Sequence, residues 1–296
     1  MLRKLFAVGL VVLFCVSAAM IAAPAISGAT LTAAEVANRN VAARGGLQAW
    51  RAVQTLSWQG KLGVGGNQRA TNSAPAPTKR NMQLPTDPRP AEEVQLPFVM
   101  DMQRPRKMRF ELQFKGQTAV QVFDGTNGWK LRPYLNRLEI EPYKEEETRM
   151  ASMQQHLDGP LVDYVAKGTH IELEGMEKVE DRDTYKLKLT MKNEQSLHVW
   201  IDAKSFLEAK MEGQPRHLDG KDHPVEIYYR DYRAVSGLQI PFELETRVLP
   251  VVNPTSRVKP MPIQPEKIFI DKVVVNPKLD ASLFSKPVVQ MALNTK

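Results

Sequence analysis

Residues 107–114 read Lys-Met-Arg-Phe-Glu-Leu-Gln-Phe, and this stretch decides the fold class. Every second side chain, from Met108 to Phe114, is apolar, and the side chains between them are charged or carry an amide. Successive side chains of a β-strand point to opposite faces of the sheet. The alternation therefore predicts a strand with one apolar face and one face in water.

The same period of two continues along most of the chain. It recurs in Thr184–Met191 and in Phe242–Val248. Further strands are expected at 55–63, 98–104, 118–124, 129–133, 170–177, 197–202, 206–212, 225–232 and 266–275, between clusters of Gly, Pro, Asn and Asp. The pattern predicts roughly ten to twelve strands of an antiparallel meander whose sheet is apolar on one face only.

Helices are expected to be few, which makes the fold mainly β. Residues 31–46 begin with Thr32 and Glu35 in a capping-box pattern and end at a Gly-Gly pair, so they predict a helix. Leu47–Gln54 is expected to form a second, short helix that packs on the sheet. Tyr143–Leu157 contains neither Pro nor Gly and is predicted to form a third.

Two proline-rich segments interrupt the strands. Thr71–Pro97 contains six prolines and few large apolar residues, so residues 71–97 are expected to form an irregular loop inserted between two strands. Pro250–Pro265 contains five prolines. Both segments are interpreted as plain surface loops, with the border of a cavity mouth as the alternative.

The N-terminus has the pattern of a secretory signal peptide. Arg3 and Lys4 precede an apolar run, Leu5–Ala23, that ends in the small-residue stretch Ala22-Ala-Pro-Ala25. We expect cleavage near Ala25, so that residues 1–25 are a signal peptide and residues 26–296 form one periplasmic domain. A retained membrane anchor is the alternative.

The cysteine and charge content narrow the class of protein. The only cysteine, Cys15, lies inside the apolar run and follows the bulky Phe14, so neither a lipidated cysteine nor a disulfide is expected in the mature chain. The net charge is +7, but basic and acidic residues are interleaved. An interleaved surface gives no support for nucleic-acid binding.

Motifs for catalysis or for cofactor binding are not found in the sequence. It contains no Gly-x-Ser-x-Gly elbow, no Walker phosphate loop and no His-Glu-x-x-His helix. His217 and His223 flank Asp219 and Asp222, a set that suits zinc or copper but is also ordinary hairpin-turn chemistry, which we favour. We therefore expect no enzyme, no catalytic residue, no metal and no cofactor.

The predicted sheet has more apolar surface than three modest helices can cover. A second packed sheet or a closed small barrel would cover the remainder. A hydrophobic molecule bound in an open, strongly bent sheet would also cover it. Periodicity alone does not separate these arrangements.

A succession of short stretches resembles one family, the LolA/LolB-like superfamily of periplasmic carriers that sort outer-membrane lipoproteins. The stretches are Ala43-Arg-Gly-Gly-Leu-Gln-Ala-Trp50, Thr55-Leu-Ser-Trp-Gln-Gly60, Gln103-Arg-Pro-Arg-Lys-Met-Arg-Phe-Glu111, Asp124-Gly125 with Gly128-Trp129, Gly159-Pro-Leu-Val-Asp-Tyr164, Tyr185-Lys-Leu-Lys-Leu189, Tyr232-Arg with Gly237-Leu-Gln-Ile-Pro-Phe242, and Asn276-Pro-Lys-Leu-Asp with Phe284. The resemblance implies a single strongly curved antiparallel sheet of about 11 strands, an unclosed β-barrel with helices as a lid over an apolar cavity.

The resemblance also implies a role for one arginine. Arg104-Pro105 stands where these carriers have an arginine that is thought to hydrogen-bond the lid helices and keep the empty cavity shut. Five guanidinium donors could satisfy helix-end carbonyls in a closed state. A surface arginine that pairs with an acid is the alternative.

The expected function is that of a carrier that holds acyl chains of lipids or lipoproteins, with membrane-associated proteins as donor and acceptor and a monomeric state. The residues expected to line the cavity are Trp58, Phe110, Leu112, Phe123, Leu187, Leu189 and Phe242. A periplasmic sensor or scaffold that binds a protein partner is the alternative, and a third reading is an enzyme of unrecognised type.

Overall fold

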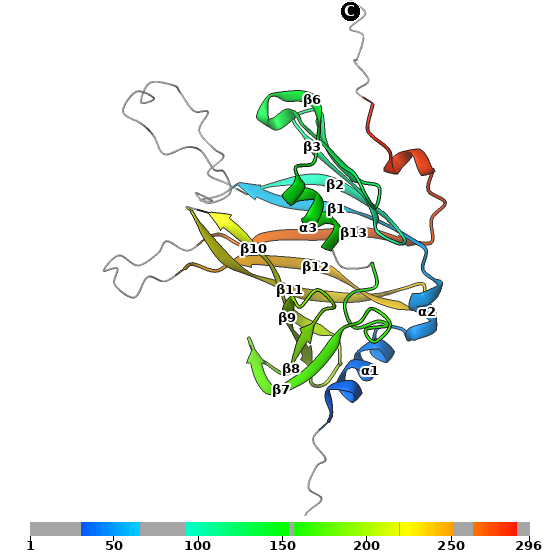
Figure 1. Ribbon diagram of the computed structural model, residues 1–296, viewed down its shortest axis with the longest axis vertical. Coiled ribbons are helices and arrows are strands. Elements are labelled where there is room, and N and C mark those ends of the chain that lie inside the picture. The colour runs from blue at the N-terminus through cyan, green and yellow to red at the C-terminus, as the bar shows by residue number, and fades with distance from the viewer. Residues whose placement is uncertain (1–30, 66–92, 154–156, 219, 252–262, 289–296) are drawn as a thin grey trace, which may run out of the picture. The chain divides into compact units, whose positions relative to one another are not determined.

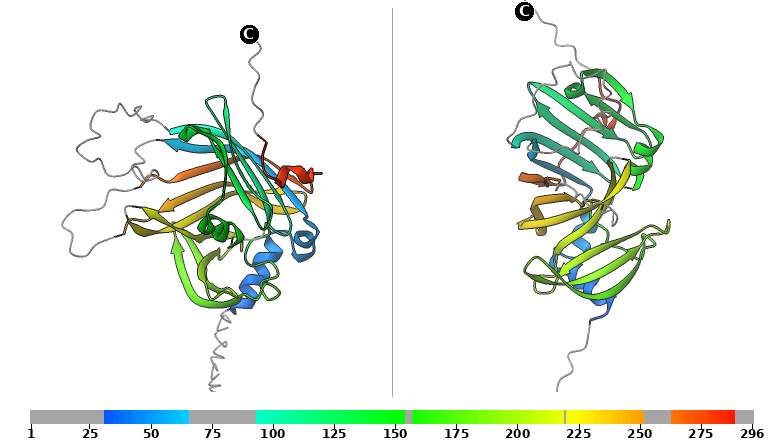
Figure 2. Two further views of the ribbon diagram at one scale, coloured as in Figure 1. Left: turned by 45° about the horizontal axis from the view of Figure 1, so that its top comes forward. Right: turned by 90° about the vertical axis from the view of Figure 1, so that its left-hand side faces the viewer.

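The computed structural model describes residues 31–65, 93–153, 157–218, 220–251 and 263–288. Thirteen strands in these residues form one antiparallel sheet in the order β6-β5-β4-β3-β2-β1-β13-β12-β11-β10-β9-β8-β7 (Figure 1). The strands are β1 (Thr55–Gly65), β2 (Glu93–Gln103), β3 (Lys107–Phe114), β4 (Gln117–Phe123), β5 (Gly128–Arg132), β6 (Arg137–Pro142), β7 (His170–Val179), β8 (Arg182–Thr190), β9 (Ser196–Asp202), β10 (Glu208–Leu218), β11 (Lys221–Val235), β12 (Leu238–Val248) and β13 (Glu266–Val275). The sheet twists strongly and does not close, since β6 and β7 remain its two edges (Figure 2).

The mainly-β, unclosed single sheet predicted from the sequence is confirmed, with 13 strands in place of about 11. Two differences concern strands that local composition hides. β6 was not expected, and β2 begins at Glu93, inside the segment predicted to be irregular. β2 pairs with β1 along its whole length, including Val64 with Val94, and this pairing outweighs the poor strand propensity of its Glu and Pro residues. The rest of that loop, 66–92, and the predicted signal peptide lie outside the described residues.

Three α-helices lie in the described residues: α1 (Ala33–Ala43), α2 (Leu47–Ala52) and α3 (Glu145–Met153). The predicted capping box is present at α1. The Thr32 hydroxyl accepts the Glu35 backbone N–H at 3.2 Å, and the Glu35 carboxylate accepts the Thr32 N–H at 2.7 Å. None of the helices in the described part is long and apolar enough to cross a membrane.

Cross-strand pairing fixes which side chains share a face. Directly opposed residues form an unbroken line across the sheet, because neighbouring strands place paired residues on the same side. The line runs Phe123–Met108, Met108 to Phe110 along β3, Phe110–Met100, Met100–Trp58, Trp58 to Leu62 along β1, Leu62–Ile268, Ile268–Leu244, Leu244–Tyr229, Tyr229 to Ile227 along β11, Ile227–Met211, Met211–Val199 and Val199–Leu187. We call this side the apolar face.

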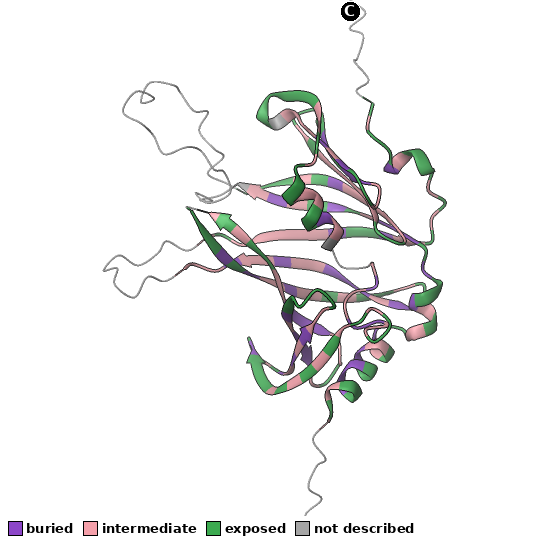
Figure 3. Cartoon of the chain, in the orientation of Figure 1, coloured by how far each residue is buried: buried purple, intermediate pink, exposed green. Residues whose placement is uncertain are grey.

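The opposite face is not wholly polar, which corrects the one-sided sheet expected from periodicity. Val122, opposite Arg109 and Trp129, is fully buried there. The C-terminal 3₁₀ helix η2 (Ala281–Phe284) contacts β3, where Arg109 donates to the Leu283 carbonyl, and its Phe284 is 1% exposed. Figure 3 shows buried, intermediate and exposed positions interspersed along the strands.

A small hydrophobic cluster on this opposite face connects the β7 edge with the middle of the sheet. Val179, Trp200 and Tyr228 pack together with Ala209. In the β7–β8 turn, Glu180 accepts two hydrogen bonds from Arg230 of β11, both 2.7 Å, and one from Arg247 of β12 at 3.0 Å. These guanidinium bonds lower the pKa of Glu180 from its ordinary value of 4.5 to about 2.

Replacing Glu180 by Gln is expected to lower the free energy of unfolding at pH 7 by about 1 kcal/mol, because the pair is partly exposed and screened by water. A depressed carboxyl pKa stabilises the fold above the ordinary value and loses this effect as the pH falls toward the folded-state pKa. The difference between the two proteins should therefore shrink between pH 4.5 and about pH 2, as followed by urea unfolding. Glu139→Gln, at an exposed position, is the matched control, and a difference that stays constant with pH would contradict the assignment.

Candidate functional site

The registers place all seven residues expected to line a cavity on the apolar face. Trp58, Phe110, Leu112 and Phe242 belong to one hydrophobic cluster. Its members come from β1, β2, β3, β11, β12 and β13, from α1 and α2, and from the residues that follow α2 and α3. Phe110 also stacks on Phe98, with ring centroids 5.7 Å apart. The structure thus brings these four together in the middle of the sheet.

The other three lie toward the two ends of the apolar face and are fully covered. Phe123 is 1% exposed, and Leu187 and Leu189 are 0% exposed. α1 contacts β7 beside the last two (Figure 1). These ends are packed against protein, whereas Trp58, Phe110 and Leu112 are only partly buried.

Tyr143 and α3 cover the apolar face at the Phe123 end. Phe123 pairs with Gly128, and a Cβ atom at Gly128 would lie 1.9 Å from the ring of Tyr143. Only glycine lets this ring lie flat on the strand. α3 follows directly and is held by an ion pair between the buried Lys130 of β5 and Glu147.

Burial also changes along the central strands. On β1, Leu56 is 0% exposed, while Trp58 and Leu62 are partly exposed. On β12, Leu238 is 1% exposed, and burial decreases through Phe242 to Leu244. The cover is therefore densest at one end of these strands, and the apolar face becomes more accessible along them.

The dense cover consists of α2 and the segment 157–168. Trp50 and Val53 from the α2 region and Val162 from the segment are buried members of the central cluster. Each is at most 2% exposed. These elements close the apolar face where Leu56 and Leu238 lie.

Arg104 holds both covering elements. Its Nε donates to the Val53 carbonyl at 2.7 Å, and its Nη2 donates to the Trp50 carbonyl at 3.0 Å. The same Nη2 lies 2.8 Å from the Asp158 carboxylate. Two bonds therefore go to carbonyls at the C-terminal end of α2 and one to the segment 157–168, a position that suits a cation at a helix C-terminus.

Asp158 is the second half of this attachment. Its side chain is 3% exposed and lies between Arg104 and the ammonium group of Lys167, 2.7 Å away. Its carbonyl accepts from Arg44, whose guanidinium lies 3.3 Å from the buried Glu208. Burial lowers the pKa of Lys167. Sequence reasoning missed these groups, because only the neighbouring Gly159-Pro160 marks a turn and no local pattern shows that a charge is buried.

Arg106 extends the attachment to α3. Its guanidinium donates to the carbonyl of Ser152, in the last turn of that helix, at 2.8 Å. The β2–β3 turn thus carries two arginines, one on each side of Pro105, that bind the C-terminal ends of different helices. Both contacts satisfy carbonyls that a helix leaves without a partner.

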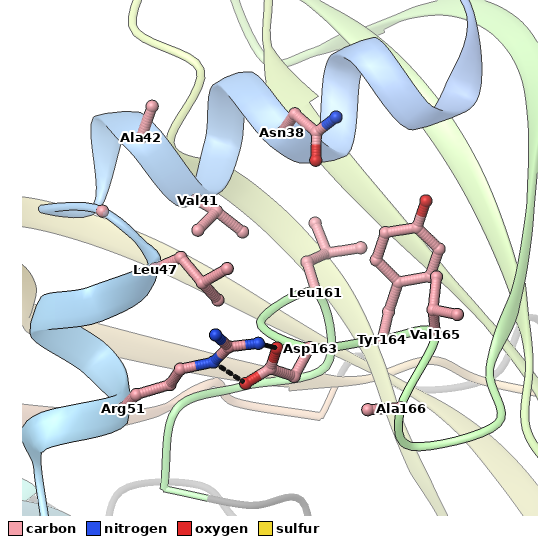
Figure 4. Close-up of a pocket in the computed structure, with 11 residues that line it drawn as sticks. Asn38, Val41, Ala42, Leu47, Arg51, Leu161, Asp163, Tyr164, Val165 and Ala166 are labelled. Atoms are coloured by element: carbon pink, nitrogen blue, oxygen red, sulfur yellow. Dashed lines mark hydrogen bonds and ion pairs between the residues drawn. The ribbon is translucent and has the colours of Figure 1, made fainter.

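A hollow of about 560 Å³ lies outside this cover, between α1, α2 and the segment 157–168 (Figure 4). Its walls are mainly apolar and include Val41, Leu47 and Leu161. Arg51 and Asp163 face each other across its rim in a bidentate pair of 2.6 and 2.9 Å. Hydrogen bonds from Arg51 lower the pKa of Asp163. This pair is a further tie between α2 and the segment.

The histidine-rich stretch forms a hairpin, as favoured from the sequence. β10 extends to Leu218 and β11 begins at Lys221, so the two strands pair closer to the turn than expected. His217 Nδ1 lies 2.8 Å from the Asp222 carboxylate. Within the described ranges no three His, Cys, Asp or Glu side chains are grouped as metal ligands.

No protein-family model matches the chain, and a search of curated proteins finds no match. Among solved structures, the chain is similar to a LolA superfamily protein of Nitrosomonas europaea, with 11% identity, 87% of this chain and 99% of the other covered, and a TM-score of 0.49. A DUF1329 family protein of Desulfovibrio piger gives 11% identity, 86% and 98% coverage and a TM-score of 0.49. A putative outer membrane lipoprotein-sorting protein domain from Vibrio parahaemolyticus has 11% identity and a TM-score of 0.48, with 86% of this chain and 96% of the other covered. Similarity at this level concerns the course of the chain and says nothing about a ligand.

Replacing Arg104 by Leu is expected to loosen α2 and the segment 157–168, because the Val53 carbonyl and one oxygen of Asp158 lose their donor and the Trp50 carbonyl loses one of two. We expect the free energy of unfolding to fall by about 2 kcal/mol. Fluorescence of an apolar dye such as anilinonaphthalene sulfonate should rise as the apolar face opens. Arg137→Leu, at an exposed pair on β6, is the control. Unchanged dye binding and unchanged ligand uptake would contradict a holding role for Arg104.

Proposed function

We propose that this protein is a periplasmic carrier that holds acyl chains of lipids or lipoproteins against the apolar face. The supporting observation is the partly exposed centre of that face, where Trp58, Phe110 and Leu112 lie between fully covered ends. Large contiguous apolar surface is rare on monomeric soluble proteins and marks a binding region. Acyl chains match such a surface because they need little beyond dispersion contacts and exclusion of water.

Arg104 is proposed as the latch of this site. In the closed state its guanidinium binds the end of α2 and Asp158. An entering acyl chain would replace the apolar contacts of α2 and Val162 and free those carbonyls to water. Asp158 would keep Lys167 as a partner, so opening would not leave a buried carboxylate without a cation.

Membrane-associated proteins are proposed as donor and acceptor, and the protein acts without catalysis or cofactor. A ligand held by non-covalent contacts leaves and enters without covalent chemistry. Sorting of outer-membrane lipoproteins is the specific role that the sequence resemblance suggests.

A sensor or scaffold that binds a protein strand at the sheet edge is the competing function. Edge strand β7 is ten residues long and has an exposed Met176. However, its register shifts between Leu173 and Gly175, and it carries Glu172, Glu174 and Glu177. Bulges and charges are the devices that keep edge strands from pairing. This edge therefore favours the carrier over strand addition.

Native mass spectrometry with lipid extraction, on protein prepared from the periplasm without detergent, tests the proposal. The wild-type protein should carry acylated species. Phe110→Glu should lower their occupancy at least about tenfold, because a carboxylate in an apolar bed stays hydrated and excludes acyl chains.

Gln113→Glu is the matched control. It adds the same charge to the same strand, at an exposed position on the opposite face, and should leave occupancy unchanged. Equal occupancy in the two variants, or a wild-type protein that is free of lipid and excludes apolar dyes, would favour the sensor or scaffold instead.

A further inference from the structure

A buried polar atom at the centre of the apolar face has no hydrogen-bond partner among the described residues. The indole Nε1 of Trp58 is buried and makes no hydrogen bond. The other tryptophan of the central cluster, Trp50, donates its Nε1 to the Arg44 carbonyl at 3.1 Å. Buried N–H groups in native proteins are nearly always paired, so a donor left free inside a binding surface indicates a missing acceptor.

The described surroundings of Trp58 do not supply that acceptor. The side chains directly opposite it on the neighbouring strands are Met100 and Val273. Leu56 and Leu62 lie above and below it on β1, and all belong to or pack on the same hydrophobic cluster. β1 is paired on both sides at this point, with β2 and with β13, so its backbone groups serve mainly the sheet ladder. Among the described residues no acceptor for the indole N–H is found, and a bound molecule would supply one.

We infer that Trp58 is a specificity-determining residue that donates a hydrogen bond to a neutral carbonyl of the ligand, the ester or amide at the head of an acyl chain. The inference rests on the proposed carrier function and deepens it. A plain hydrocarbon or an ether-linked chain offers no comparable acceptor. A site that holds a buried donor discriminates against ligands that leave it unpaired.

A free fatty acid fits this position less well than an ester. Its carboxylate would enter an apolar bed, where an unpaired charge is strongly disfavoured. Two arginines near this face are already paired: Arg104 with Asp158, and Arg233, which lies over Phe242, with Asp231. A neutral carbonyl satisfies the indole and brings no charge.

The test compares two lipids that differ only in the carbonyl: a diacyl phosphatidylcholine and its dialkyl-ether counterpart of equal chain length. Binding is measured by displacement of an apolar fluorescent dye from the full-length mature protein. The wild-type protein should bind the diacyl lipid about threefold to tenfold more tightly, the effect of one neutral hydrogen bond. Free palmitate should bind less tightly than the diacyl lipid.

Trp58→Phe keeps an aromatic ring and removes the N–H, so the ratio of the dissociation constants of the dialkyl-ether and diacyl lipids should fall to about one. Phe110→Leu, on the same face, should weaken both lipids alike and keep the preference. A wild-type protein without preference, or a preference that Trp58→Phe retains, overturns this inference and leaves the carrier intact. Failure of both lipids to bind overturns the carrier and this inference with it. If Trp58→Phe does not fold, the preference of the wild-type protein for the diacyl over the dialkyl-ether lipid decides whether the inference holds.

Discussion

A sheet of thirteen strands with one continuous apolar face needs that face covered, and this requirement shapes the rest of the molecule. Three short helices and the segment 157–168 cannot cover all of it. α1 closes the end near Leu187, and Tyr143 with α3 closes the end near Phe123. The centre remains partly exposed around Phe110. Such a surface is stable in water only when specific contacts fix the covering elements on the sheet or when a ligand takes their place.

Polar contacts hold the cover because apolar contacts alone would leave it free to slide. The holding groups converge from distant parts of the chain: Arg104 from the β2–β3 turn, Asp158 and Lys167 from the covering segment, and Arg44 from the end of α1. Hydrogen bonds are directional, so they fix one position of the cover. The carbonyl of Arg44 also accepts from Trp50 and from Gln239, which joins the cover to β12.

Period-two alternation predicts which side of its strand a residue occupies, and this is why the seven residues chosen from the sequence share one face. Depth of burial is a tertiary property. Phe110 and Leu187 have the same local pattern, yet only Leu187 is sealed, because α1 lies at its end of the sheet. Strand pairing, and not local composition, determines the start of β2, which lies opposite the end of β1, and the formation of β6, which pairs with β5. The charge on Asp158 can be buried because Arg104 and Lys167 pair with its carboxylate, and no local pattern in the sequence predicts that these three residues meet.

In the proposed carrier, the strength of the Arg104 contacts would set a minimum size for a ligand that displaces the cover. Arg104 makes three hydrogen bonds, each contributing about 1 kcal/mol net, so releasing the cover costs about 3 kcal/mol. Each methylene group removed from water contributes about 0.8 kcal/mol. About four buried methylenes offset the broken bonds, and a chain several times longer leaves a surplus for binding. Short apolar solutes would therefore leave the cover closed, while an acyl chain of membrane-lipid length would open it. A hydrogen bond from Trp58 would then separate esterified chains from other long hydrocarbons.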